Sequence, residues 1–272
     1  MKKKILVFCL GMTFPLCLVL ASFEERPFSA RSAALGESMV AVIGTESSYY
    51  NPAGLAFLSG TGVVLGHTEL YSLDELDHTT AGVSHTTKKI GSWGAYGTSF
   101  GSALYRETEM GVSWAVHLTS TSAVGITVKR QDLRLERYGG IGAWQSDLGV
   151  VSRPIPKVTL GATVHNVTQS RLSGTSESPS SSLVAGATGE LWARGLTTLS
   201  VVQQSGGETS WRVGQEVLLH SVLAVRAGFE TAPNRFTLGA GFCLRRCRLD
   251  YAFLTHASLP DQHFFTLSWQ TP

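Results

Sequence analysis

The sequence contains little charge and few cysteines, and these two shortages exclude several classes of protein. Charged residues make up 15% of the 272 positions, and there are 4 cysteines. So few cysteines cannot form a disulfide scaffold. Hydrophobic residues account for 43% of the chain, which excludes an intrinsically disordered protein, and the 9 prolines are too few for a collagen.

Neither sign of charge dominates the chain. It has 22 basic and 20 acidic residues, and three of the basic residues are Lys2, Lys3 and Lys4 at the N-terminus. Without these three, 19 basic residues remain against 20 acidic ones. We therefore expect no nucleic-acid partner.

The first residues contain the one long apolar run. The three lysines precede a mostly apolar stretch from Ile5 to Ala21. A positive segment followed by an apolar one is typical of a secretory signal peptide, so we predict a signal at 1–22, cleaved after Ala21 or Ser22. The run is short for a retained membrane anchor, which needs about 20 apolar residues.

The exported chain, from residue 23 onward, has no apolar run near the length of about 18 residues that indicates a membrane-spanning helix. A closed β-barrel is the other structure that can cross a bilayer. Two of the cysteines lie in the signal, which leaves Cys243 and Cys247. The residue pattern places these two on opposite faces of a hairpin, so a disulfide would require a break in register, and this pairing stays open.

Strict alternation is the strongest pattern after residue 60. From Lys157 to His165, every even position is apolar and every odd position is polar, charged or glycine. Such a period of two predicts β-strands. We predict fourteen strands, most of them long enough to cross hydrocarbon when tilted, near residues 61–71, 78–87, 91–100, 109–118, 122–132, 142–153, 157–167, 181–193, 195–205, 209–219, 222–230, 235–244, 247–256 and 262–270.

The second face of these strands distinguishes a membrane barrel from a soluble sandwich. That face consists mainly of glycine, serine and threonine, whereas a soluble sheet would present many charges to water. Tryptophans near strand ends fit an aromatic girdle, and the chain finishes on a strand with Phe265, Leu267 and Trp269 on one face. We predict an all-β protein with a transmembrane antiparallel β-barrel of about 14 strands over residues 61–272. The alternative is a secreted or periplasmic β-sandwich.

Residues 23–60 do not alternate. Small residues dominate from Ser29 to Val42, which predicts a short helix, and a breaker-rich stretch follows from Ser47 to Leu58. A compact irregular element before a barrel fits inside it or at its periplasmic mouth. We therefore predict a short N-terminal helical hatch, or plug, over residues 23–60.

The motifs of this hatch resemble a known family. The run from Tyr50 to Leu55 is similar to the Asn-Pro-Ala hatch motif of the FadL superfamily of outer-membrane transporters. The run from Ser29 to Arg31, with Leu35 and Gly36, resembles the PorV/PorQ branch more specifically. Segments of the C-terminal half agree in order and spacing: 211–216, 225–229, 236–241 and 249–253.

The resemblance implies a 14-stranded barrel, plugged by a hatch, in the cell outer membrane of a Gram-negative-type envelope, with no cofactor. FadL members are implicated in the passage of long-chain fatty acids and other hydrophobic compounds. PorV acts with the type IX secretion machinery as a shuttle for exported cargo. We expect passage of small hydrophobic molecules through a hatch-gated barrel in outer-membrane lipid. The alternative is a non-transport platform or shuttle for secretion-system or envelope proteins.

Two groups of residues are the candidates for a functional site. Asn51, Pro52, Ala53 and Gly54 form the hatch motif, where either gating or packing against the barrel wall would explain them. The inward charges are Arg31 on the hatch and Glu216, Arg226 and Asp250 on the wall. We expect these charges to pair across the lumen and hold the plug.

Enzymatic activity is not expected. The run from Gly97 to Gly101 matches the Gly-x-Ser-x-Gly nucleophile elbow, but an elbow needs a strand-to-helix turn and this run lies in a predicted strand. His117, His165, Asp250 or Glu216 could supply a base, but no set of them has catalytic spacing. The eight histidines are scattered singly, so no metal site is expected either.

Overall fold

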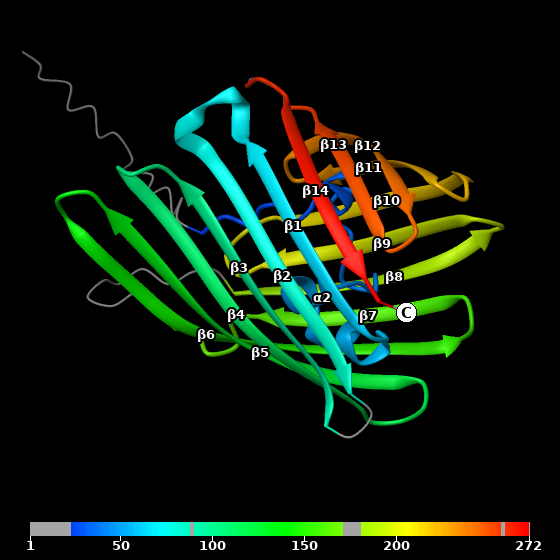
Figure 1. The fold of residues 1–272 in the computed structure, drawn as a ribbon. Helices are drawn as coiled ribbons and strands as arrows, with labels where there is room; N and C mark the ends of the chain where they lie inside the picture. Colours follow the sequence, from blue (N-terminus) through cyan, green and yellow to red (C-terminus); the bar gives the residue numbers. More distant parts are fainter. Residues whose placement is uncertain (1–22, 88–89, 171–180, 257–258, 272) are drawn as a thin grey trace, which may run out of the picture.

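The computed structural model describes residues 23–87, 90–170, 181–256 and 259–271. Its fourteen strands form one closed antiparallel barrel, in which each strand pairs with its sequence neighbours and β1 pairs with β14 (Figure 1). The predicted fold class is confirmed: an all-β barrel of fourteen strands preceded by short helical pieces. The predicted signal peptide, residues 1–22, lies outside the described residues.

The elements follow one another as a meander. The strands are β1 (Thr61–Glu69), β2 (Asp77–Thr87), β3 (Gly91–Gly101), β4 (Tyr105–His117), β5 (Ser122–Leu135), β6 (Gly139–Ile155), β7 (Val158–His165), β8 (Ser182–Trp192), β9 (Gly195–Gln204), β10 (Thr209–His220), β11 (Leu223–Thr231), β12 (Asn234–Leu244), β13 (Cys247–Leu254) and β14 (Gln262–Gln270). The helical pieces are α1 (Ala30–Ala34), α2 (Ser47–Tyr50), η1 (Pro52–Phe57), η2 (Leu70–Ser72) and η3 (Asp74–Leu76).

The hairpin of β5 and β6 is longer than the sequence pattern predicts. The predicted strand ends near residue 132, and the charges from Arg134 to Arg137 are interpreted as lying near a strand end. In the structure the ladder continues to the pair of Leu135 and Gly139. Arg130 and Asp132 form an ion pair on the strand with N···O of 2.7 Å, so opposite charges satisfy positions that apolar residues occupy elsewhere.

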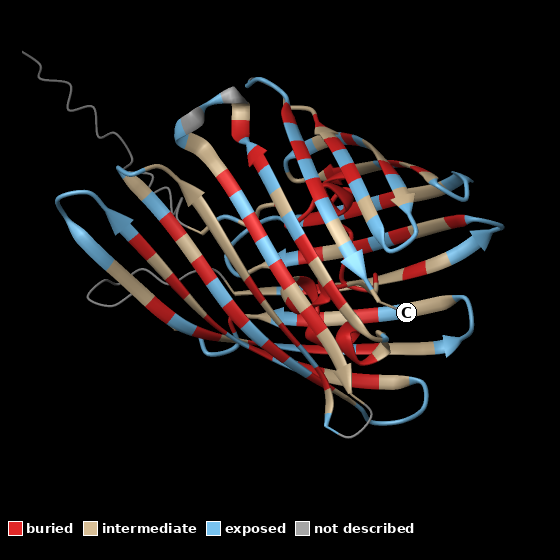
Figure 2. Cartoon of the chain, in the orientation of Figure 1, coloured by how far each residue is buried: buried red, intermediate tan, exposed pale blue. Residues whose placement is uncertain are grey.

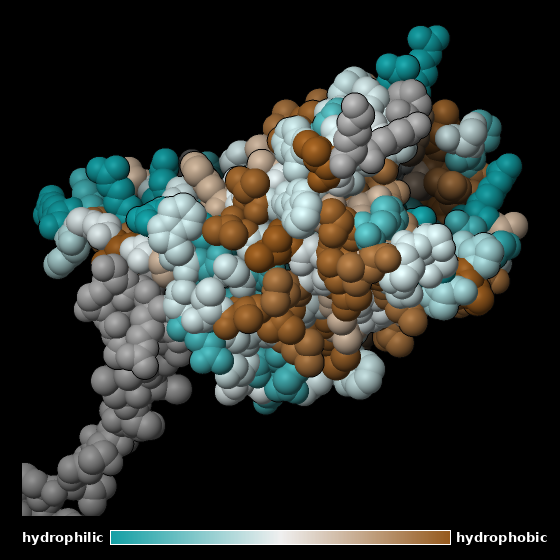
Figure 3. Space-filling view, turned by 90° about the horizontal axis from the view of Figure 1, so that it is seen from below, coloured by the Kyte–Doolittle hydropathy of each residue, from teal (hydrophilic) through white to brown (hydrophobic). Residues whose placement is uncertain are grey.

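The two faces of the barrel wall differ in polarity. On β4, the outward side chains of Met110, Val112 and Trp114 are 68%, 63% and 50% exposed, while Glu109 and Ser113 on the other face are buried. Figure 2 shows buried and exposed residues alternating along many of the strands. Apolar side chains gather across the middle of the surface seen in Figure 3, with polar residues toward its sides. An apolar outer band and a polar interior are what a barrel in hydrocarbon requires.

The two ends of the barrel differ in their connections. We call one end the turn end; its described connections are short turns at 118–121, 156–157, 193–194, 221–222 and 245–246. We call the opposite end the loop end; it carries the longer connection 70–76 between β1 and β2. All six tryptophans are outward and exposed. Four of them lie near the turn end, namely Trp93, Trp114, Trp192 and Trp269.

Residues 27–56 lie inside the barrel and are almost all buried. The helix predicted over residues 29–42 is wrong in extent, because α1 ends at Ala34. Ser29 caps it by a reciprocal capping box with Ser32. The helix cannot continue because Gly36 and Glu37 adopt left-handed backbone angles, with φ of 59° and 61°. The chain then turns back across the lumen toward α2.

None of the described helices is long and apolar enough to span a membrane.

The open question of the cysteines has an answer in the structure. Cys243 and Cys247 are free thiols. Cys247 is exposed on the outer face, whereas Cys243 pairs across the hairpin with Arg248, so the register holds and keeps the sulfurs on opposite faces.

The outward face generates a first prediction. Val112→Arg places a charge on the apolar band, and it should lower the free energy of unfolding in lipid by about 2–4 kcal/mol. Denaturant titration of the refolded protein in vesicles measures this. Glu136→Arg, in the connection of β5 and β6, is the matched control. Equal losses in the two variants would contradict an apolar face at Val112.

Candidate gate formed by the N-terminal hatch

Asn51 connects the hatch to the barrel wall through a single side chain. Its amide nitrogen donates hydrogen bonds to the carbonyl oxygens of Val40 at 2.8 Å, Val150 at 3.1 Å and Ala162 at 3.3 Å. Its amide oxygen accepts from the backbone N–H of Ala53 at 3.2 Å and so caps η1. Val150 and Ala162 are paired neighbours on β6 and β7. The hatch therefore bonds to carbonyl groups of two adjacent wall strands.

The other motif residues shape the turn that carries Asn51. Pro52 occupies the first turn of η1, where its missing N–H costs nothing. Ala53 and Gly54 are buried in the same short helix. A Cβ at position 54 would contact the Ser47 hydroxyl oxygen at 2.6 Å. Small residues are thus required where η1 folds back onto α2.

Glycines on the inner face of the wall make room for hatch atoms that lie against them, and we call these positions the glycine seats. A Cβ at Gly149 would collide with the Asn51 amide oxygen, and a Cβ at Gly161 would collide with the Val40 carbonyl oxygen. The glycine-rich inner face that indicated a small-residue lumen is therefore covered by backbone and side-chain atoms of the hatch. The same close approach of hatch atoms occurs at Gly62, Gly94, Gly125, Gly214, Gly228 and Gly239.

The structure brings all four predicted lumenal charges together. The Arg31 guanidinium donates to both carboxylate oxygens of Glu216, at 3.0 Å each. Arg226 donates to Glu216 at 2.5 Å and to Asp250 at 2.8 Å. Arg31 belongs to α1, whereas the other three belong to β10, β11 and β13. One hatch residue is therefore ion-paired into a wall network, with Asp250 fully buried.

This network returns to the hatch at a second point. Arg248 donates to Asp250 at 2.7 Å and lies 3.7 Å from the carboxylate of Glu46, which precedes α2. Arg31 and Glu46, distant in the hatch sequence, are thus bound to one set of wall charges. The set alternates in sign along its length, so each buried charge has a partner.

A second network at the loop end was not predicted. Arg212 on β10 pairs with Glu230 on β11 at 2.8 Å and with Glu25 of the hatch at 3.0 Å. Nearby, Arg26 pairs with Glu107 on β4 at 2.7 Å. The inward positions of Arg212 and Glu230 follow from the alternation, but their contact depends on the register between β10 and β11. The hatch is therefore fastened near its start as well as at Arg31.

The histidines considered as bases have structural partners. His165 lies 3.1 Å from Asp147, which also pairs with Lys129 at 2.9 Å. His117 contacts the carbonyl oxygen of Ala56 through Nε2 at 2.9 Å and packs against the hatch. Ser99 of the Gly-x-Ser-x-Gly run lies within β3, without the following helix that a nucleophile elbow needs.

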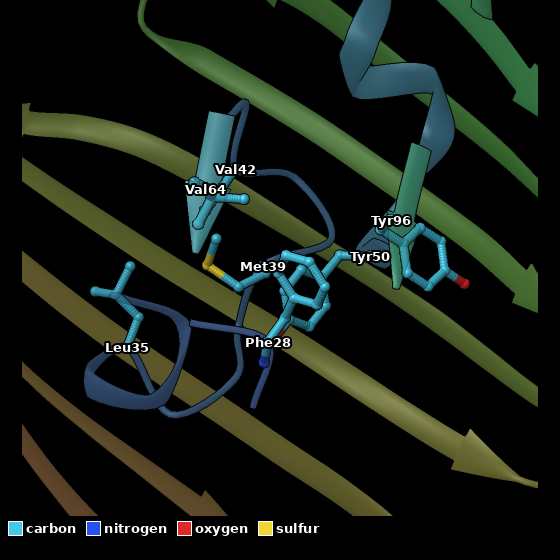
Figure 4. Close-up of a cluster of buried hydrophobic side chains, with 7 residues drawn as sticks. All are labelled: Phe28, Leu35, Met39, Val42, Tyr50, Val64 and Tyr96. Carbon is cyan, nitrogen blue, oxygen red and sulfur yellow. The ribbon is translucent and has the colours of Figure 1, made fainter. Parts of the chain in front are cut away.

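Aromatic rings fill the space between the ion-pair networks. Phe28 stacks on Tyr49 with ring centroids 5.0 Å apart, and Tyr96 of β3 meets both rings edge-on at 5.9 and 5.2 Å. Phe28, Met39 and Tyr50 lie together in Figure 4, with Tyr96 beside them. The lumen thus has an apolar centre surrounded by charged pairs.

Glu37 is an acidic group at the edge of this apolar centre. Its Oε1 accepts a hydrogen bond from the Tyr50 hydroxyl at 2.9 Å. Its Oε2 is buried and has no hydrogen-bond partner among the described residues. Burial raises the pKa of Glu37 to about 7. Arg212 opposes this rise, the carboxylates of Glu25 and Glu230 add to it by smaller amounts, and the Tyr50 hydrogen bond opposes it least.

The chain is a closed fourteen-stranded barrel with its N-terminal segment packed in the lumen. The sequence matches no protein-family model, and no curated protein is similar enough in sequence to be found by comparison. Solved structures do share the fold. At the identities found, this likeness concerns the fold alone.

Three of these structures illustrate the likeness. The toluene transporter TodX of P. putida is 14% identical, with a TM-score of 0.67 over 91% of this chain and 99% of that one. The monoaromatic hydrocarbon channel CymD is 14% identical, with a TM-score of 0.64 over 90% and 97% of the two chains. A Pseudomonas aeruginosa FadL homologue is 11% identical, with a TM-score of 0.60 over 87% and 97%.

The glycine seats generate a second prediction. Gly149→Ala should push Asn51 off the wall, because the added methyl group collides with its amide oxygen. The loss of its bonds to β6 and β7 should cost about 1–3 kcal/mol. Hydrogen exchange at residues 40–54 should become faster. Gly97→Ala is the control, since its Cβ would find its nearest neighbour atom at 3.8 Å. Unchanged exchange in Gly149→Ala would refute the seat.

Glu37 generates a third prediction, on pH. The carboxyl pKa is higher in the folded protein than the ordinary 4.5, so the folded state retains a proton that the unfolded state has lost. Stability should therefore fall as the pH rises from 4.5 to about 7 and then level off. Glu37→Gln should remove this contribution. Thermal unfolding of both proteins across this pH range measures it, and parallel curves would contradict the assignment.

Proposed function

We propose that this chain is an outer-membrane barrel through which small hydrophobic molecules pass, with the hatch controlling access. The observation that carries the proposal is the combination of closed barrel and lumenal hatch, an arrangement of the same fold as a toluene transporter and a monoaromatic hydrocarbon channel. The predicted signal peptide, residues 1–22, would export the chain. The loop end would face the cell exterior and the turn end the periplasm, because barrels of this class have short periplasmic turns.

In this proposal the Asn-Pro-Ala-Gly motif and Arg31 hold the hatch in its closed position. A molecule can cross the lumen only if the hatch leaves its glycine seats. Leaving them breaks the Asn51 bonds to β6 and β7 and the pairing of Arg31 with Glu216. The rings of Phe28, Tyr49 and Tyr96 would offer an apolar surface to a fatty-acid-like or aromatic molecule once the hatch shifts.

A hatch locked in place tests gating directly, and it forms the fourth prediction. Ser38 on the hatch and Thr198 on β9 are buried, with their hydroxyl oxygens 3.1 Å apart. Cysteines at both positions, with Cys243 and Cys247 changed to serine, should form a disulfide under oxidation. Uptake of radiolabelled oleate and toluene by Gram-negative cells lacking their own hydrophobic-compound channels should drop on oxidation and recover on reduction.

The two single-cysteine variants are the controls, since neither can form the bridge. Uptake that continues through the oxidised double variant would rule out the hatch as the gate. Uptake no greater than in cells without the protein would rule out transport itself.

The second candidate is a membrane platform or shuttle of the PorV type, with envelope or secretion-system proteins as partners. The observation that favours it is that ion pairs hold the hatch to the wall at two separate places, Arg31 with Glu216 and Glu25 with Arg212. Such a double attachment would suit a permanent plug. Absence of uptake, together with co-purification of one large envelope partner in stoichiometric amount, would support this candidate over transport.

A further inference from the structure

Three metal-ligating side chains meet on the outer face of the barrel, near the loop end. His67 and Glu69 are two residues apart on β1 and so point to the same side. Asp77 is the direct cross-strand partner of Glu69 on β2. One donor atom from each residue lies within 4.8 Å of the other two. His67 and Glu69 are exposed, so a dissolved ion can reach them.

The two carboxylates of this cluster lack any positive partner among the described residues. Like charges directly opposite each other across a ladder destabilise the pair. The other described strand carboxylates, with the exception of Glu190, each form an ion pair with a basic side chain: Glu107, Glu109, Asp132, Asp147, Glu216, Glu230 and Asp250. The facing pair of Glu69 and Asp77 therefore departs from the rule that the rest of the barrel follows.

The cluster lies where the connection between β1 and β2 begins and ends, so its charges act on the ends of that connection. Glu69 and Asp77 are the residues on either side of the connection 70–76. Leu70, at the start of this connection, is buried against the hatch helix α1 and the wall, in a cluster with Ala30, Ala33 and Phe264. The two carboxylates thus stand at the base of a loop that folds inward onto the hatch. Their mutual repulsion acts to spread that base.

We propose that His67, Glu69 and Asp77 bind a divalent zinc ion that neutralises both carboxylates and holds the base of the 70–76 connection together. Imidazole nitrogen and carboxylate oxygen are both zinc ligands, and three protein ligands with a water in the fourth position complete a tetrahedral site. Ligand atoms in such a site lie about 3.3 Å apart, and the three donor atoms here lie within 4.8 Å of one another before any ion is bound. The site is independent of the hatch-gating proposal.

Zinc titration of the purified, metal-stripped, full-length protein in detergent tests the site. The unaltered protein should bind one zinc ion that His67→Ala, Glu69→Gln and Asp77→Asn each weaken by more than about tenfold. His220→Ala and Glu190→Gln are matched controls, because each removes an exposed histidine or an unpaired carboxylate elsewhere. Both should bind like the unaltered protein. The heat-dependent shift in gel mobility confirms that each variant is folded.

Hydrogen exchange provides a second readout. Zinc should slow exchange in residues 70–76 of the unaltered protein and have no such effect in Glu69→Gln. Failure of the unaltered protein to bind zinc would overturn the site, and so would binding by His67→Ala and Glu69→Gln as tight as that of the unaltered protein. Binding without slower exchange in the connection would overturn its role as a clamp.

Discussion

The structure depends on one constraint, the need to pair every backbone N–H and C=O group of the wall. A sheet with an apolar outer face meets this need in hydrocarbon only by closing on itself, and the pairing of β1 with β14 does so here. Fourteen strands enclose more space than their own inward side chains can fill. The hatch occupies that space. Glycine on the inner face follows from this, because hatch backbone lies directly against wall backbone at positions such as Gly161 and Gly228.

Polar contacts rather than apolar packing fix where the hatch sits. Asn51 donates hydrogen bonds to two carbonyl groups of the wall, and Arg31 donates two hydrogen bonds to the carboxylate of Glu216. The attraction within a buried ion pair often does little more than offset the free energy of removing both charges from water. A displaced hatch, however, would leave Glu216 or Asp250 buried without a full set of partners. Such a displaced position is therefore strongly disfavoured, and the charges specify one seat among the many that a smooth apolar lumen would allow.

Much of the barrel could be predicted from period-two alternation, because each strand buries one face in the lumen and presents the other outward. The same parity indicated that Glu216, Arg226 and Asp250 face inward. Arg31 lies outside any alternating segment, so alternation alone does not determine the direction of its side chain. The contacts of Arg212 with Glu230, and of Glu69 with Asp77, need the register between strands, which uncertain strand ends do not fix. The extent of the first helix was missed because small residues suit a helix and a tight turn equally, and the left-handed angles of Gly36 and Glu37 decide between them.

The closing pair of strands has a consequence for assembly. The segment inside the ring precedes β1 in the chain, and the ring is sealed by β14, the final strand. The seal therefore forms around a segment synthesised before any part of the wall. If residues 27–56 are in place when β1 pairs with β14, formation of this one ladder encloses them. The hatch and the strand farthest from it in the chain are thus linked by a single step of barrel closure.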